Sequence, residues 1–238
     1  MDEVQVVVAD NENNRAKTFT HGGKFEFDIK LDRPFDVTLS QTGHLYLTSG
    51  GDKCVQVFSA KGHKVTTMGQ GQLDTPLGIT LNRQGHVMVC DGEEKFIFTF
   101  HPDSGELLNT IPLSMCEYPR YITVNSSNDN IVISDWWEHC VHVLSPTGDQ
   151  LYQYGTEGSG DDQLAAPSGV CTDRYGHIFI ADCNNHRIVA LSPRGKFIRY
   201  IATEDDGLES PKALAISPAG MLVVAEADGK VKKFQYLQ

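Results

Sequence analysis

Short runs of apolar residues alternate with short polar turns along almost the whole chain. The segment "IFIADCNNHRIVALSPRGKFIRYI", residues 178–201, shows the pattern most clearly, with three apolar runs separated by two polar turns. The apolar residues in the first two runs are consecutive rather than alternating, as in strands that are buried on both faces. Asn, Asp, Gly and Pro in the turns are typical of hairpins. The pattern therefore predicts three successive β-strands joined by tight turns.

This unit recurs through the sequence. Similar apolar runs that end in a polar turn lie at residues 6–15, 45–54, 87–96, 131–140 and 222–231. All of these runs except the first, and also the run that begins at residue 178, follow a predicted strand that begins near a proline. These prolines are Pro34, Pro76, Pro119, Pro167 and Pro211, and successive ones are 42 to 48 residues apart. A period in the forties with four short strands in each unit is typical of a β-propeller blade.

The repeats predict an all-β chain that forms a single six-bladed β-propeller over residues 1–238. The expected blades comprise residues 1–32, 33–74, 75–117, 118–165, 166–209 and 210–238. The first and last blades are incomplete in sequence, with three predicted strands each. We expect these two blades to close the ring together, because closure removes exposed sheet edges.

Composition and charge exclude some partners. The chain has 20 Lys and Arg against 31 Asp and Glu, and the net charge of −11 opposes non-specific adhesion to nucleic acid or to an anionic membrane. No apolar run approaches the roughly 20 residues that span a bilayer. The six cysteines are scattered and form no C-x-x-C pair. We therefore expect buried, reduced cysteines, no membrane partner and a cytoplasmic protein.

One repeat carries enough motif residues to resemble a known family. Its pattern consists of Pro167, Gly169, Val170, Gly176, Ala181, Asp182, Asn185, Arg187, Ile188, Ser192 and Gly195. These residues resemble NHL repeats, and the ending "KFQYLQ" resembles the C-termini of TRIM-NHL ubiquitin ligases. Four units depart from the pattern at the position of Arg187, where Cys54, Phe96, Cys140 and Val231 stand instead.

The resemblance implies a non-catalytic domain of a larger protein. In TRIM-NHL ligases the propeller follows RING, B-box and coiled-coil segments. It binds proteins destined for ubiquitin transfer in some members and single-stranded or hairpin RNA in others. By resemblance, the parent protein is a RING-type E3 ubiquitin ligase, and this chain is its recognition domain.

The polar turn Asp182–Arg187 has two interpretations. His186 and Asp182 could act as an acid and a base, or Asp182 could accept hydrogen bonds from turn amides and pair with Arg187. The motif partly recurs at Asp10–Arg15, which favours the structural interpretation. We expect no catalytic residues in this chain.

The histidines do not predict a metal site. His44, His86 and His177 each follow a glycine in equivalent turns, so they are expected on separate blades and do not converge. Residues 155–160, "GTEGSG", lack the Lys-Ser/Thr of a phosphate-binding loop. We therefore expect no metal and no cofactor.

The fourth predicted blade carries the best candidate for a binding site. Loops that precede the inner strand and loops between the second and third strands share one rim of a propeller, and here they read "YPRY" (118–121) and "DWWEHC" (135–140). Trp, Tyr and Arg are the usual hot-spot residues of interfaces. The alternative is that the tryptophans only pack against the next blade. With the neighbouring turn included, the expected partner-binding residues are Tyr118, Arg120, Tyr121, Trp136, Trp137, His139, His186 and Arg187.

The expected partner is a protein, a substrate for ubiquitylation, and the isolated domain is expected to be monomeric. The alternative is an RNA-binding propeller, because the same aromatic and arginine side chains stack on unpaired bases. Acidic residues outnumber basic ones on this rim, which argues against a large phosphate footprint. The opposite face offers a looser basic set for RNA: Lys61, Lys64, Arg83, Arg174, Arg194 and Lys196.

A propeller enzyme with a metal in its central channel would need carboxylates or histidines from several inner strands. The five inner strands offer only Asp36. We rank this possibility below both binding hypotheses.

Overall fold

The computed structural model describes residues 6–20 and 22–236 of the chain. These residues form β-strands joined by turns, with three single-turn 3-10 helices: η1 (Asn11–Asn13), η2 (Cys183–Asn185) and η3 (Glu204–Asp206). No helix in this described part is long and apolar enough to cross a membrane. The outermost parts of the first and last predicted blades, residues 1–5 and 237–238, lie outside the described residues.

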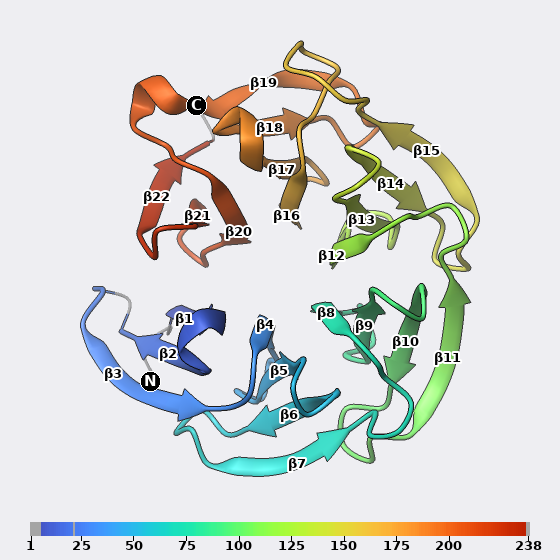
Figure 1. Cartoon of the computed structure of the whole chain (residues 1–238), viewed down its shortest axis with the longest axis vertical. Coiled ribbons are helices and arrows are strands. Elements are labelled where there is room, and N and C mark those ends of the chain that lie inside the picture. Colours follow the sequence, from blue (N-terminus) through green and yellow to red (C-terminus); the bar gives the residue numbers. More distant parts are fainter. Residues whose placement is uncertain (1–5, 21, 237–238) are drawn as a thin grey trace. The chain divides into compact units, whose positions relative to one another are not determined.

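The strands group into two compact units, Met1–Ile111 and Pro112–Gln238. The first unit contains three antiparallel sheets (Figure 1). The first sheet comprises β1 (Val6–Asp10), β2 (Arg15–Phe19) and β3 (Phe25–Lys30). The second sheet comprises β4 (Pro34–Leu39), β5 (Leu45–Ser49), β6 (Cys54–Phe58) and β7 (Lys64–Met68). The third sheet comprises β8 (Pro76–Leu81), β9 (Val87–Asp91), β10 (Phe96–Phe100) and β11 (Leu107–Pro112).

The second unit repeats this arrangement with three further sheets. The fourth sheet comprises β12 (Pro119–Val124), β13 (Ile131–Asp135), β14 (Cys140–Leu144) and β15 (Gln150–Tyr154). The fifth comprises β16 (Pro167–Thr172), β17 (Ile178–Asp182), β18 (Arg187–Leu191) and β19 (Phe197–Ala202). The sixth comprises β20 (Pro211–Ile216), β21 (Met221–Glu226) and β22 (Val231–Gln235).

Within each sheet the strands pair in sequence order, as in a propeller blade. The predicted all-β fold class, a six-bladed β-propeller, is confirmed: six sheets are present, and the first and last have three strands each. Each predicted inner strand begins at the expected proline. Closure of the ring by the two three-stranded sheets stays a prediction.

Burial explains why the second and third strands are apolar at consecutive positions. Every residue of β5, β9, β13 and β17 is buried, whereas the outermost strands β7, β11, β15 and β19 are largely exposed. Within each unit the inner strands of successive sheets lie side by side, β4 with β8 and β12 with β16 and then β20. The core therefore forms between neighbouring sheets, so both faces of a middle strand are covered.

Hydrogen bonds through side chains join the second and third sheets. The Asp36 carboxylate, on β4, accepts the backbone N–H of Ile79 on β8 at 3.0 Å, and its other oxygen accepts the N–H of Val37 at 2.8 Å. The hydroxyl of Thr48, on β5, donates to the carbonyl oxygen of Leu77 at 2.7 Å. These contacts link two adjacent sheets that share no strand ladder.

Gly169, on β16, allows the fifth and sixth sheets to approach each other closely. A Cβ at this position would lie 2.8 Å from the Ala213 Cα atom and equally close to the Leu214 nitrogen and the Lys212 oxygen, all backbone atoms of β20. Backbone atoms of a paired strand cannot move aside as a flexible side chain can. The glycine of the predicted Pro-x-Gly motif is therefore required here by packing.

We expect Gly169→Ala to lower the free energy of unfolding by about 1–3 kcal/mol, because the added methyl group forces β16 and β20 apart. Gly22→Ala is the control, since its Cβ would meet only the Thr20 hydroxyl, at 3.8 Å. Urea denaturation followed by circular dichroism measures both variants. Equal stability of the two variants would contradict the close approach.

Asp36 should make stability depend on pH. Burial raises the pKa of its carboxyl group from 3.8 to about 7, although two backbone N–H groups favour the ionised form. The folded state then binds the proton more tightly than the unfolded chain, so the free energy of unfolding falls as the pH rises from about 4 to 7. In Asp36→Asn this fall should be smaller, as measured by denaturation at a series of pH values. An unchanged pH profile in the variant would show that another group is responsible.

Candidate functional site

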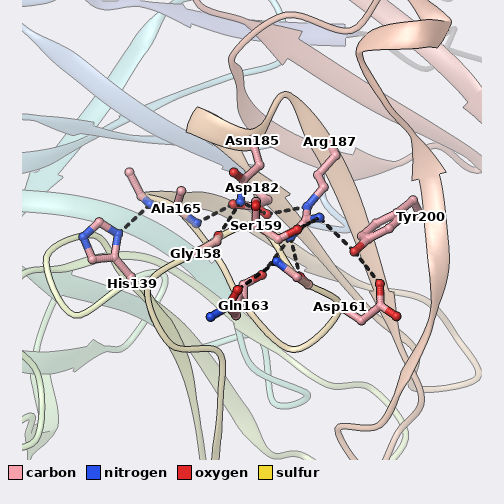
Figure 2. A network of polar contacts seen from close by, with 12 residues as sticks. His139, Gly158, Ser159, Asp161, Gln163, Ala165, Asp182, Asn185, Arg187 and Tyr200 are labelled. Atoms are coloured by element: carbon pink, nitrogen blue, oxygen red, sulfur yellow. Dashed lines mark hydrogen bonds and ion pairs between the residues drawn. The ribbon is translucent and has the colours of Figure 1, made fainter.

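The turn between β17 and β18 is a compact polar corner in the fifth sheet. Asp182 ends β17, is fully buried, and accepts the backbone N–H of Ala165 at 2.7 Å and the side-chain amide of Asn185 at 2.8 Å. Arg187 begins β18, and its Nε donates to the same carboxylate at 2.7 Å. Burial raises the pKa of Asp182, while these donors and the Arg187 charge act in the opposite direction. The corner of the best-matching repeat is therefore a satisfied polar network (Figure 2).

Arg187 holds the linker that leads into the fifth sheet. Besides Nε, its terminal nitrogens donate to the carbonyl oxygens of Ser159, Gly160 and Gln163 and to the Tyr200 hydroxyl, at 2.7 to 2.9 Å. All five guanidinium donors are thus engaged. The side chain is buried, and this geometry supports the structural interpretation of the Asp182–Arg187 turn.

Other sheets use the acidic residue at the end of the second strand in the same way. Such a corner carboxylate accepts the backbone N–H of a residue in the preceding linker, 17 or 18 positions earlier in the chain. These pairs are Asp91 with Asp74, Asp135 with Glu117, Asp182 with Ala165, and Glu226 with Glu209. Each corner carboxylate therefore fixes the linker just before its own inner strand begins.

A second contact runs from three of the corners to the next sheet. His139 and His186 occupy the left-handed backbone region, with φ of 52° each. Their Nδ1 atoms accept the backbone N–H of Ala166 at 2.9 Å and of Ser210 at 3.1 Å, which directly precede β16 and β20. Asn14 does the same for Arg33 with its side-chain oxygen, at 2.9 Å. Both histidines of the predicted binding set are thus half-buried connectors between sheets.

The sixth sheet differs from the sequence alignment by one residue. Ala225 pairs with Val231, whereas the equivalent Ala181 pairs with Ile188, so Lys230 and not Val231 stands at the position of Arg187. The corner turn of this sheet is one residue shorter. Lys232 contacts the Glu226 carboxylate, with its Nζ 2.9 Å from Oε1.

The aromatic residues predicted on the fourth sheet do gather at one corner. The guanidinium of Arg120 lies 4.0 Å from the ring centroid of Trp136, and the ammonium of Lys212 lies 4.7 Å from it. The rings of Tyr118 and Trp137 meet edge to face, with centroids 6.4 Å apart. We call Tyr118, Arg120, Trp136, Trp137 and Lys212 the aromatic corner.

Members of the predicted set differ in exposure. Trp137 is 67% exposed, and Tyr118, Arg120 and Trp136 are half-buried. Tyr121 is buried, and its backbone N–H donates to the Ser134 hydroxyl within the fourth sheet. The sequence analysis missed Lys212, which lies on β20, two sheets away from Trp136. The sequence signal that could have identified Lys212 is its position directly after Pro211, which is equivalent to the position of Arg120 directly after Pro119.

The basic residues proposed for RNA are exposed on turns and outer strands. Lys61, Lys64 and Arg83 belong to the first unit, and Arg174, Arg194 and Lys196 to the second. Arg174 is engaged locally, since its Nη2 donates to the Tyr175 hydroxyl at 2.7 Å.

Three side chains of types that can bind a metal ion lie close together at the corner of the fourth sheet. Cys116, Asp135 and His142 place one ligand atom each within 4.8 Å of one another, and all three are buried. Burial lowers the pKa of His142, against the opposing effect of Asp135 and Glu138. The sequence analysis considered the histidines alone and did not connect His142 with the cysteines.

Comparison with known proteins supports the family resemblance. Residues 164–191 match the NHL repeat family. NHL-repeat-containing protein 4 of Mus musculus is 39% identical over 72 residues, which are 30% of this chain and 51% of that protein. The E3 ubiquitin-protein ligase TRIM56 of Mus musculus is 28% identical over 110 residues, which are 46% of this chain and 15% of that protein. The matched segments thus span about half or less of these relatives.

The fold is also found among solved structures. A streptogramin B lyase structure has a TM-score of 0.72 at 17% identity and covers 98% of this chain and 80% of that chain. A likeness at this identity shows the fold alone. The sequence matches show that the chain carries an NHL repeat at residues 164–191 and that it resembles NHL-repeat proteins and TRIM-type ubiquitin ligases.

We expect Arg187→Lys to lower the free energy of unfolding by about 1.5–3 kcal/mol, because an ammonium group cannot replace five donors in a fixed plane. Arg15→Lys is the matched control, since Arg15 pairs with Asp10 at the equivalent corner but is one-third exposed. Its loss should be smaller, because water screens a partly exposed ion pair. Denaturation curves of both variants measure these losses. Equal losses of unfolding free energy would show that burial does not determine how much the arginine contributes to stability.

Proposed function

We propose that this chain is the recognition domain of a TRIM-NHL-like ubiquitin ligase and binds a protein partner through the aromatic corner. The observation that carries the proposal is the exposure of Trp137, which is the most exposed of the large apolar side chains in the described part of the chain. An exposed tryptophan loses contact with water when a partner covers it, and such residues dominate interface energies.

Folding does not require a tryptophan at this position. The equivalent residues of four other corners, two places after the end of the second strand, are Glu12, Gly51, Glu93 and Asn184. Polar residues or glycine therefore satisfy the same turn elsewhere in the chain. The aromatic ring at Trp137 has a local neighbour in Tyr118 but fills no core.

The side chain is presented on a rigid turn. The backbone N–H of Trp137 donates to the corner carboxylate Asp135 at 3.1 Å, and the next N–H, of Glu138, donates to the same oxygen at 3.2 Å. The same carboxylate accepts the N–H of Tyr118. Both rings of the pair are thus anchored through one buried group. Preorganisation of this kind lowers the entropy lost on binding.

Charge favours a protein over RNA as the partner. The Arg120 guanidinium and the Lys212 ammonium both already lie over the Trp136 ring, which leaves less of the ring open for a stacked base. The chain carries a net charge of −11, which weakens contact with phosphates. An apolar protein surface fits the exposed Trp137 ring better than a nucleic-acid backbone does.

The ligase context is part of the proposal and rests on relatives. The similar proteins include E3 ubiquitin-protein ligases, and the chain matches a minor part of their length. We infer that ubiquitin transfer belongs to other segments of such a protein and that this propeller selects what is modified. No catalytic role is proposed for any residue of this chain.

The test compares Trp137→Ala with Leu151→Ala in quantitative affinity purification from cells, followed by calorimetry with each purified partner. Leu151 is an exposed apolar residue on β15, so this variant controls for non-specific hydrophobic binding. We expect Trp137→Ala to weaken binding by about 30-fold, equivalent to about 2 kcal/mol for a hot-spot residue. Partners that bind both variants equally well would contradict the proposal.

The RNA alternative is tested with a random single-stranded RNA pool at low and physiological salt. Loss of RNA binding in Trp137→Ala and Arg120→Glu would assign RNA to the aromatic corner. Loss only in Lys61→Glu/Lys64→Glu would assign it to the basic turns. The protein-binding proposal predicts no salt-resistant RNA binding by any of these proteins.

A further inference from the structure

The fourth sheet departs from its neighbours at three buried positions that lie around one corner. The first is the linker residue just before the N–H that the corner carboxylate accepts. This residue is Leu73, Leu164 or Leu208 before the corners of Asp91, Asp182 and Glu226, and each leucine is buried. Before the corner of Asp135 it is Cys116, which is also buried.

The second and third departures lie on β14. Cys140 pairs with Asp135 as Arg187 pairs with Asp182, so a thiol replaces the guanidinium. His142 follows two residues later, on the same face of the strand, where β18 has Val189. A leucine, an arginine and a valine of the best-matching repeat thus become two thiols and an imidazole around one carboxylate.

The ligand atoms of these residues are close together. Those of Cys116, Asp135 and His142 all lie within 4.8 Å of one another. The Cys140 Sγ lies 3.3 Å from His142 Nε2, and Asp135 Oδ2 lies 3.9 Å from the same nitrogen. In a tetrahedral zinc site, metal–ligand bonds of about 2.0–2.3 Å place neighbouring ligand atoms about 3.5 Å apart. The distances from His142 Nε2 to Cys140 and to Asp135 lie within a few tenths of an ångström of this spacing. Binding would draw the Cys116 sulfur, which lies within 4.8 Å of the Asp135 and His142 ligand atoms, closer to them.

We propose that Cys116, Asp135, Cys140 and His142 form a structural site for one zinc ion. Two thiolates, one imidazole nitrogen and one carboxylate oxygen supply the four ligands of a closed tetrahedral site. All four residues are at least 97% buried, as a structural rather than a catalytic ion requires. Binding displaces the two thiol protons, so the ion and its ligands together carry a charge of minus one.

The charge of the ion also fits the corner. At the fifth sheet the buried Asp182 pairs with the positive charge of Arg187. Cys140 cannot supply that charge to Asp135, whereas a divalent cation can. The metal would thus replace the guanidinium that ties the corner together in the best-matching repeat.

A second group orients the imidazole. The Gln150 side-chain Nε2 lies 3.2 Å from His142 Nδ1. Metal binding through Nε2 requires the amide to be turned by 180°, so that its oxygen accepts the Nδ1–H and the Nε2 lone pair faces Cys140 and Asp135. Polar partners on the far side of a ligating histidine commonly set its tautomer in this way.

The test uses the chain unfolded in guanidinium with a chelator, then refolded with or without equimolar Zn²⁺ or Co²⁺. We expect one ion per chain by elemental analysis, thiolate-to-cobalt charge-transfer bands with tetrahedral d–d bands, and loss of those bands on addition of Zn²⁺. A refolded chain that retains neither metal nor these bands would overturn the proposal.

Two variants introduce residues that occur at the equivalent positions of other sheets in this chain, so they should fold. Cys116→Leu introduces the residue found before three other corners, and His142→Gln introduces the residue at the equivalent Gln56 of β6. Both should lose the cobalt bands, while circular dichroism shows a folded chain. Cys54→Ser is the control, because Cys54 occupies the place of Cys140 in the second sheet. Bands that persist in both variants, or that disappear equally in Cys54→Ser, would contradict the site.

Discussion

In the third to the sixth sheet, the corner carboxylate is the interaction on which the rest of the sheet depends. Asp91, Asp135, Asp182 and Glu226 are buried at the ends of second strands, where an uncompensated charge would be unfavourable. Each accepts a backbone N–H from the linker that leads into its own sheet. A short polar turn therefore also fixes where the sheet begins. Such carboxylates explain why strand, turn and linker recur as one unit, since none of the three is positioned without the others.

The same constraint explains how one corner can acquire function without a change of fold. The carboxylate of Asp135 holds the turn through backbone atoms, so the side chains of that turn are free to vary. At the fifth sheet they complete a structural network around Arg187. At the fourth sheet they place Trp137 in solvent and Cys140 and His142 beneath it. The residues that we propose for binding thus occupy positions that the backbone network leaves open.

Much of the fold could be predicted because its signals are local. Prolines begin the inner strands, consecutive apolar residues mark the middle strands, and Gly169 reports a close approach between sheets. The aromatic corner was also predictable in outline, because loops of one propeller rim come from known places in the repeat. The sequence suggested that Tyr121 would join Tyr118 at the binding site. In the structure Tyr121 lies on β12 and is buried.

The sequence by itself determined the periodic architecture and the presence of two tryptophans in one solvated turn, because strand burial and turn geometry depend on residues near in the chain. Only the tertiary structure decided that Lys212 covers Trp136 and that Cys116 meets His142. Both contacts join residues that are far apart in sequence and meet only when linkers and neighbouring sheets are packed. Strand pairing also decided which residues of the sixth sheet correspond to those of the fifth. The corner turn of the sixth sheet is one residue shorter, so each later residue corresponds to a position one place further along the fifth sheet.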